Sequence, residues 1–121
     1  FIRDDELPGF FGRAHAVVLP YTDGTQSGVA AMALGYGRAV VSTRVGSVQE
    51  MVRDGDNGIL VPPCDAKALT EALRRIVKEP ALAQAMGERS YALGQRELSW
   101  ARNAEISSQA YSQAIAKRGR A

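Results

Sequence analysis

The sequence predicts an α/β fold, a three-layered open sheet of parallel strands that ends in C-terminal helices. Two observations predict it. Apolar runs of strand length alternate with segments of helical periodicity along the chain. The connections between them are short, so each crossover returns to the sheet and consecutive strands lie parallel.

The chain opens with a predicted helix and strand. Residues 4–15 carry apolar side chains at helical spacing, and Asp4 or Asp5 is placed to cap the helix. Residues 16–20 form a short apolar run, which predicts a strand buried on both faces. His15 ends the helix, and we expect it to act as a C-terminal cap rather than a general base.

A second helix and strand follow. Residues 27–36 are rich in Ala and Met and begin at Ser27, a good N-cap residue, while Gly35 and Gly37 are placed to end the helix. Residues 39–43 form a second apolar run of strand length. This order predicts a crossover between two parallel strands.

The third unit is shorter. Residues 47–53 predict a short helix in which Ser47 and Glu50 have the spacing of a capping box, which explains Glu50 without a functional role. Residues 54–58 contain two glycines and must turn. The third strand is predicted at residues 59–61.

Three helices complete the chain, beginning after Asp65, at Glu79–Pro80 and after Ser99. Their predicted core-facing residues are Leu69, Ala72, Leu73 and Ile76, then Leu82, Met86 and Leu93, and finally Trp100, Ala104, Tyr111 and Ile115. We place a domain boundary after residue 98, so that residues 99–121 form a C-terminal helix and basic tail.

Composition excludes several classes of protein. The chain of 121 residues is 45% apolar and 23% charged with a net charge of +2, which is typical of a globular domain and argues against a nucleic-acid partner. Cys64 is the single cysteine, which excludes an internal disulfide and a multi-cysteine zinc site. We expect it to be a small loop residue.

The sequence has no apolar run of membrane-spanning length and no secretory signal, and nothing in it supports a peripheral membrane contact. We therefore expect a cytoplasmic protein. The chain starts at Phe1 without a Met, and three strands are few for a sheet covered on both faces. We expect it to be part of a longer protein whose missing half of the sheet precedes Phe1.

Ligands of open parallel sheets bind beyond the carboxyl ends of the strands. The most polar segment there is the loop before the second helix, where Gly24, Thr25, Gln26, Ser27 and Gly28 precede or open the helix. Free N–H groups and the helix dipole predict an anion site, with a diphosphate as the expected ligand. The alternative is structural: Ser27 is also a good N-cap, and Gly28 could serve helix packing.

Four stretches resemble the group 1 glycosyltransferases, the retaining GT-B, family 4-like enzymes that use nucleotide sugars. They are residues 4–20, the segment GRAVVSTRVGSVQEMV at 37–52, the segment DGDNGILVPP at 54–63, and LSW at 98–100. The resemblance runs from Phe1 to about Tyr111 with nearly unchanged spacing. It is therefore specific.

The resemblance implies an enzyme of two Rossmann-like domains that face a cleft, with the nucleotide-sugar donor held mainly by the C-terminal one. Residues 1–98 would be the later part of that donor-binding domain, and the acceptor-binding N-terminal domain would be missing. The implied reaction transfers a sugar from a nucleotide-diphosphate sugar to an unknown acceptor with retention of configuration. No metal and no other cofactor are expected, and the fragment alone is expected to be inactive.

One departure from the family pattern concerns two glutamates that members usually carry near the donor sugar and the ribose. Depending on the register, their positions fall on Gly24 and Met32 or on Thr22 and Ala30. Asp23, Val29 and Met32 are the remaining candidates for sugar or ribose contacts, and no catalytic residue is assigned. Two alternatives stay open: a GT-B sugar-nucleotide epimerase, and a non-catalytic binding relative.

Overall fold

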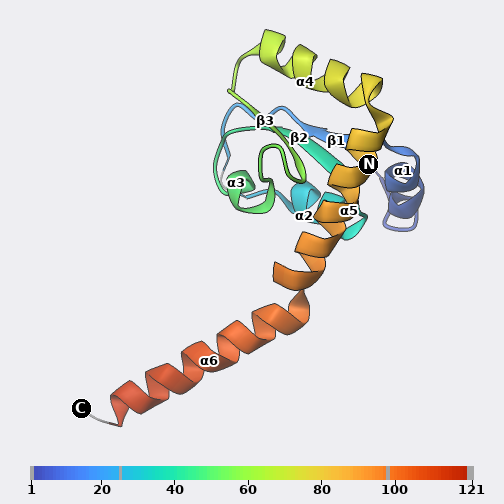
Figure 1. Ribbon diagram of the computed structural model, residues 1–121. Coiled ribbons are helices and arrows are strands. Elements are labelled where there is room, and N and C mark those ends of the chain that lie inside the picture. Colours follow the sequence, from blue (N-terminus) through green and yellow to red (C-terminus); the bar gives the residue numbers. More distant parts are fainter. Residues whose placement is uncertain (1, 25, 98, 120–121) are drawn as a thin grey trace.

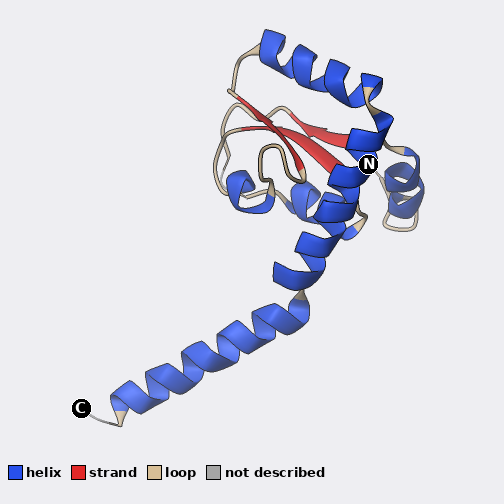
Figure 2. Ribbon diagram, viewed as in Figure 1, coloured by secondary structure: helices blue, strands red, loops and turns tan. Residues whose placement is uncertain are grey.

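The structure is a computed structural model that describes residues 2–24, 26–97 and 99–119, with the backbone alone at Trp100. Its elements, in chain order, are α1 (Leu7–Arg13), β1 (Ala16–Leu19), α2 (Gly28–Gly35), β2 (Ala39–Thr43), α3 (Val48–Met51), β3 (Gly58–Val61), α4 (Ala66–Lys78), α5 (Pro80–Glu97) and α6 (Trp100–Arg118). The sheet lies between α4 above and α2 and α3 below (Figure 1). The predicted α/β class is confirmed (Figure 2).

The strands form one parallel sheet in the order β1-β2-β3. Val17 pairs with Val40 and Val41 pairs with Ile59. Every residue of β2 is buried, as expected for the central strand of three. The prediction that the first strand is buried on both faces is wrong at Val18, which is 38% exposed. On that face α4 and α5 lie over β2 and β3 and leave the edge strand β1 partly uncovered.

Successive residues of each strand point to opposite faces of the sheet, so they belong alternately to two hydrophobic clusters, one on each face. The first joins Leu19, Val40 and Leu60 to helices α1, α2 and α3, and the second joins Val41, Ile59 and Val61 to α4. Helix α5 contributes to both clusters, with Met86 in the second and Leu93 in the first. It therefore runs past the amino end of the sheet from one outer layer to the other (Figure 1).

Two glycines let α5 approach the sheet. A Cβ at Gly87 would overlap the carbonyl oxygen of Gly37, and Gly37 itself has φ +66° after the end of α2. Both positions therefore require glycine, one for contact and the other for backbone conformation. The prediction that glycines end the second helix is confirmed, with Tyr36 as the C-cap.

The first helix is shorter than predicted. It begins at Leu7 rather than at residue 4, and its N-cap, Glu6, makes no side-chain cap hydrogen bond. The Glu6 carboxylate instead accepts the N–H of Arg3 at 2.9 Å, so the acidic residues stabilise a turn ahead of the helix. The predicted role of Asp4 or Asp5 as a cap is wrong. The C-cap is Ala14, so the expected cap role of His15 is wrong too.

Helix α3 and the turn after it are fixed differently from the expected capping box. The Ser47 side chain makes no cap hydrogen bond to this short helix. The turn is organised by Asn57, whose buried side chain accepts the N–H of Arg53 at 2.7 Å and donates to the carbonyl of Met51 at 2.9 Å. Because an unpaired buried amide would be costly, Asn57 holds this turn in one conformation.

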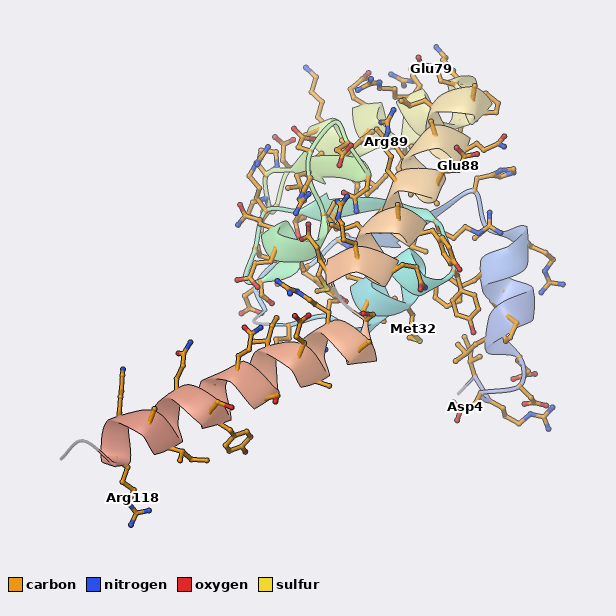
Figure 3. The ribbon with its side chains drawn as sticks, turned by 60° about the horizontal axis from the view of Figure 1, so that its bottom comes forward. Asp4, Met32, Glu79, Glu88, Arg89 and Arg118 are labelled. Atoms are coloured by element: carbon orange, nitrogen blue, oxygen red, sulfur yellow. The ribbon has the colours of Figure 1, made fainter. Side chains whose placement is uncertain are left out.

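The last helix contradicts the prediction that it packs on the core. Ser99 caps it as predicted, accepting the N–H of Arg102 at 3.1 Å. The described side chains of residues 101–118 are all exposed, Tyr111 and Ile115 at 72% each, because α6 projects away from the sheet (Figures 1 and 3). Ala104 is exposed with them, and the side chain of Trp100 lies outside the described residues. The boundary at residue 98 stays a prediction.

Candidate functional site

The carboxyl ends of the three strands bring together the segments that the sequence singled out. The loop after β1 is tied to β2 by two hydroxyls: Thr43 Oγ1 donates to the carbonyl of Tyr21 at 2.7 Å, and Ser42 Oγ donates to that of Leu19 at 3.2 Å. Both donors are buried. The start of this loop is therefore held rigidly against the central strand.

The loop leads into α2 through Ser27, which is 5% exposed. Its hydroxyl oxygen accepts the N–H of Ala30 at 3.0 Å and also lies 3.0 Å from the hydroxyl of Tyr21. The structural alternative for Ser27 is thus confirmed: it is the N-cap of α2. Its hydroxyl is already engaged within the protein, so the donors that Ser27 and the start of α2 leave for a ligand are backbone N–H groups.

Two N–H groups remain at this helix terminus. Among the residues that the structure describes, neither Gly28 nor Val29 donates its N–H to another group. Gly24, Gln26 and Gly28 are exposed, and Thr25 lies outside the described residues. No heavy atom would lie within 4 Å of a Cβ at Gly28, so a side chain could be accommodated at this first position of α2. An anion placed there would meet free donors and the positive end of the helix dipole.

We predict that Ser27→Ala lowers the free energy of unfolding by about 1 kcal/mol, because α2 loses its cap. Tyr21→Phe removes the hydroxyl pair and leaves the cap, so it should cost less. Urea unfolding of both variants measures the difference, with Ser107→Ala on the exposed face of α6 as the control. If Ser27→Ala and Tyr21→Phe lowered the free energy of unfolding equally, loss of the helix cap would not explain the effect of Ser27→Ala.

The three candidates for sugar or ribose contacts lie in different surroundings. Asp23 is exposed, and Val29 is 38% exposed on the first turn of α2. Met32 is half-buried against the first hydrophobic cluster, and with Val29 and Phe10 it lines an apolar groove of about 430 Å³. Asp23 is therefore the one charged side chain among these three candidates.

Sequence reasoning missed a cation at the same edge of the sheet. Arg44 directly follows β2, its N–H donates to the carbonyl of Val61 at 2.9 Å, and its guanidinium lies 3.3 Å from Asp54. A basic residue next to a strand's carboxyl end was the available signal. A shallow cavity of about 330 Å³ lies between Thr22, Thr43 and the loop after β3, where Cys64 is an exposed loop residue as expected.

Two other titratable residues that the sequence singled out lie elsewhere. Glu50 is exposed on α3, and His15 precedes β1 at the opposite end of the sheet. Among the described residues, no group of three His, Cys, Asp or Glu side chains could hold a metal ion. No helix in the described part of the chain is long and apolar enough to cross a membrane.

Comparison with known proteins decides the family. Residues 1–79 match the family model described as glycosyl transferases group 1. The chain belongs to this family. The D-inositol 3-phosphate glycosyltransferase of Arthrobacter sp. (strain FB24) is 34% identical over 114 residues, which are 94% of this chain and 27% of that protein. The glycogen synthase of Mycobacterium tuberculosis (strain H37Rv) is 33% identical, over 94% of this chain and 27% of that enzyme.

Solved structures agree on the fold of this glycosyltransferase chain. The sucrose-phosphate synthase of Thermosynechococcus elongatus superposes with a TM-score of 0.86 and 32% identity, over 96% of this chain and 29% of that one. HepE of Anabaena, solved in complex with UDP, superposes with a TM-score of 0.81 and 20% identity, over 91% and 30% of the two chains. The GT-B expectation for the fold is confirmed. The chain spans between a quarter and a third of the length of these four proteins.

Proposed function

We propose that the protein transfers a sugar from a nucleotide-diphosphate sugar to an acceptor, with retention of configuration. The observation that carries the proposal is the open pair of N–H groups at Gly28 and Val29, at the carboxyl edge of the sheet of a group 1 glycosyltransferase. HepE, which shares the fold, has been solved with UDP and with UDP-glucose, which supports a nucleotide-sugar donor.

In this proposal the donor diphosphate lies against the amino end of α2, over residues 24–28. As the bond between sugar and diphosphate breaks, negative charge grows on the leaving oxygen. Preorganised N–H groups and the helix dipole stabilise that charge without reorganisation. The stabilisation needs neither a carboxylate nor a metal, so the proposal accommodates the missing glutamates and invokes no cofactor.

The donor's ribose and sugar would then lie beside the first turn of α2. Asp23 and the exposed side of Val29 are the groups within the described residues that we propose to contact them, with Met32 behind them. We propose that Asp23 is the polar contact, because it is the charged member of the three and is exposed. The acceptor would come from the other side of the cleft, which this chain does not supply.

Titration of the intact protein with UDP, GDP and ADP tests the donor site. We expect one of the three to bind with micromolar to millimolar affinity, because base contacts outside residues 24–28 choose among them. Incubation with the matching nucleotide sugar then tests the reaction, and NMR of the product's anomeric proton reads retention. Absence of binding by all three would contradict the donor site.

The two alternatives give different products. An epimerase converts the nucleotide sugar without releasing free nucleoside diphosphate or requiring an acceptor, whereas a non-catalytic relative binds and releases it unchanged. We expect nucleoside diphosphate release that depends on an acceptor. The 121 residues alone should show none, and transfer by this chain by itself would contradict the role proposed for the rest of the cleft.

A further inference from the structure

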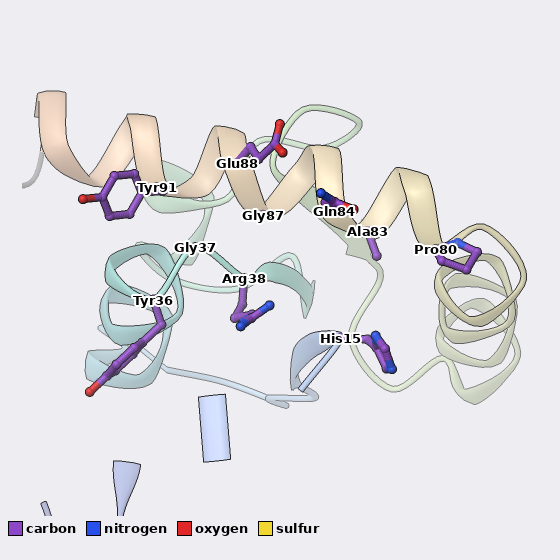
Figure 4. Close-up of a pocket in the computed structure, with 10 residues that line it drawn as sticks. All are labelled: His15, Tyr36, Gly37, Arg38, Pro80, Ala83, Gln84, Gly87, Glu88 and Tyr91. Carbon is purple, nitrogen blue, oxygen red and sulfur yellow. The ribbon is translucent and has the colours of Figure 1, made fainter. Parts of the chain in front are cut away.

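A second cavity lies at the amino ends of β1 and β2, at the opposite edge of the sheet from the proposed donor site (Figure 4). Its volume is about 640 Å³, within the range of small-molecule sites. The lining residues are His15, Tyr36, Gly37, Arg38, Pro80, Ala83, Gln84, Gly87, Glu88 and Tyr91. They come from the turns before β1 and β2 and from one side of α5.

Arg38 is the unusual residue of this cavity. Its side chain is half-buried, Nη2 donates to the carbonyl of Gly12 at 3.3 Å, and the buried Nε has no hydrogen-bond partner within the described structure. No described carboxylate forms an ion pair with it. The described arginines that do pair with carboxylates are Arg3, Arg44, Arg53, Arg74, Arg75, Arg89, Arg96 and Arg102.

Two other described arginines have no carboxylate partner, Arg13 and Arg118. Both are exposed, so water solvates their charge. Arg38 is shielded on one side by the protein, and the carbonyl of Gly12 compensates only part of its charge. A partly desolvated guanidinium that lacks a counter-ion is costly, and an anion in the cavity would offset that cost. The arrangement is therefore that of an anion site.

The other polar groups of the cavity fit an oxyanion. In Figure 4 the guanidinium of Arg38 points into the space below α5, Gln84 lies above it and His15 lies across from it. The imidazole has at least one N–H to donate in either protonation state, and the Gln84 amide can donate two. The Glu88 carboxylate also lines the cavity, but in the same view it points away from Arg38.

We propose that this cavity binds a phosphate monoester of a small polar molecule, with Arg38 and His15 on the phosphate. The buried Nε of Arg38 does not reach the cavity, so the phosphate would meet the terminal nitrogens, Nη1 and the N–H of Nη2 that is not bonded to Gly12. An imidazole N–H of His15 adds a donor from another direction. The cavity is larger than a phosphate group needs, and Pro80, Ala83 and the ring of Tyr91 provide walls for the ester's organic part. The site is independent of the proposed donor site.

Calorimetric titration of the intact protein with glycerol 3-phosphate, inorganic phosphate and glycerol tests the proposal. We expect one site, with the ester tighter than phosphate and no binding of glycerol. Arg38→Met should weaken the ester about tenfold or more, because a charged hydrogen-bond donor is lost. Arg118→Met removes the same charge on exposed α6 and should leave the affinity within about twofold.

His15→Leu provides a second variant, since His15 is exposed and its loss should not affect folding. We expect it to weaken the ester about threefold or more. Saturating UDP should not displace glycerol 3-phosphate, which separates this site from the donor site. The proposal is overturned by no binding at millimolar ester, by displacement with UDP, by equal affinity for ester and phosphate, or by unchanged binding in both cavity variants.

Discussion

Gly58→Ala is expected to lower the free energy of unfolding by about 3 kcal/mol or more. Gly58 pairs with Val40 where β2 and β3 meet, and both residues are buried. A Cβ at Gly58 would overlap the carbonyl oxygen of Val40 and lie 2.8 Å from Cγ1 of Val52. Since the overlapped atom belongs to the backbone of the central strand, the sheet must distort to admit one methyl group.

Thermal and urea unfolding measure this effect, and a loss of that size lowers Tm by about 12 °C or more. Gly9→Ala is the matched control, because it lies within α1 with no heavy atom within 4 Å of its Cβ. We expect the control to be neutral or to gain up to about 1 kcal/mol from helix propensity. A Gly58→Ala protein as stable as the control would show that β2 and β3 do not meet closely here.

Gly28→Asp is expected to weaken nucleoside diphosphate binding about 100-fold or more while the fold is retained. A carboxylate at the first position of α2 is favourable for the helix itself, by a few tenths of a kcal/mol or about 1 at most. The same carboxylate repels a diphosphate placed against the N–H groups of Gly28 and Val29. Binding and stability should therefore change in opposite directions.

Gly28→Asn is the control for this variant, since it has the size of Asp without the charge. We expect it to bind nucleoside diphosphate far better than Gly28→Asp does. The two variants should unfold at similar denaturant concentrations. Gln113→Glu on exposed α6 controls for net charge and should bind like the unchanged protein. If the Asp and Asn variants bound equally, the diphosphate would not lie at the amino end of α2.

Local signals predicted much of the fold. The second strand has its predicted limits at residues 39–43, and Ser27, Asp65 and Ser99 cap their helices by accepting an N–H three residues ahead. Caps and strands of this kind depend on a few neighbouring residues, so the sequence contains the necessary information. The candidate anion site was predicted for the same reason, because it is a helix terminus beyond a buried strand.

Other features needed contacts between distant segments. The apolar residues on one side of α6 resemble a core-facing stripe, yet Tyr111 and Ile115 are exposed because no described element packs against that helix. Periodicity shows which residues share a face, but it does not show whether anything covers that face. The first helix is shorter than predicted for a similar reason. The acidic residues ahead of it bond to Arg3 and stabilise a turn, so they do not cap the helix.

The sequence by itself determined the order of strands and helices along the chain, their parallel connection, the N-caps at Ser27, Asp65 and Ser99, and the family, because each depends on local pattern or on a run of motifs. Only the tertiary structure decided that α5 passes the end of the sheet over Gly37, that Asn57 fixes the turn before β3, and that Arg38 has no counter-ion among the described residues. These depend on residues brought together from separate parts of the chain, and the cost of burying a polar group or closing a contact is set by that three-dimensional neighbourhood.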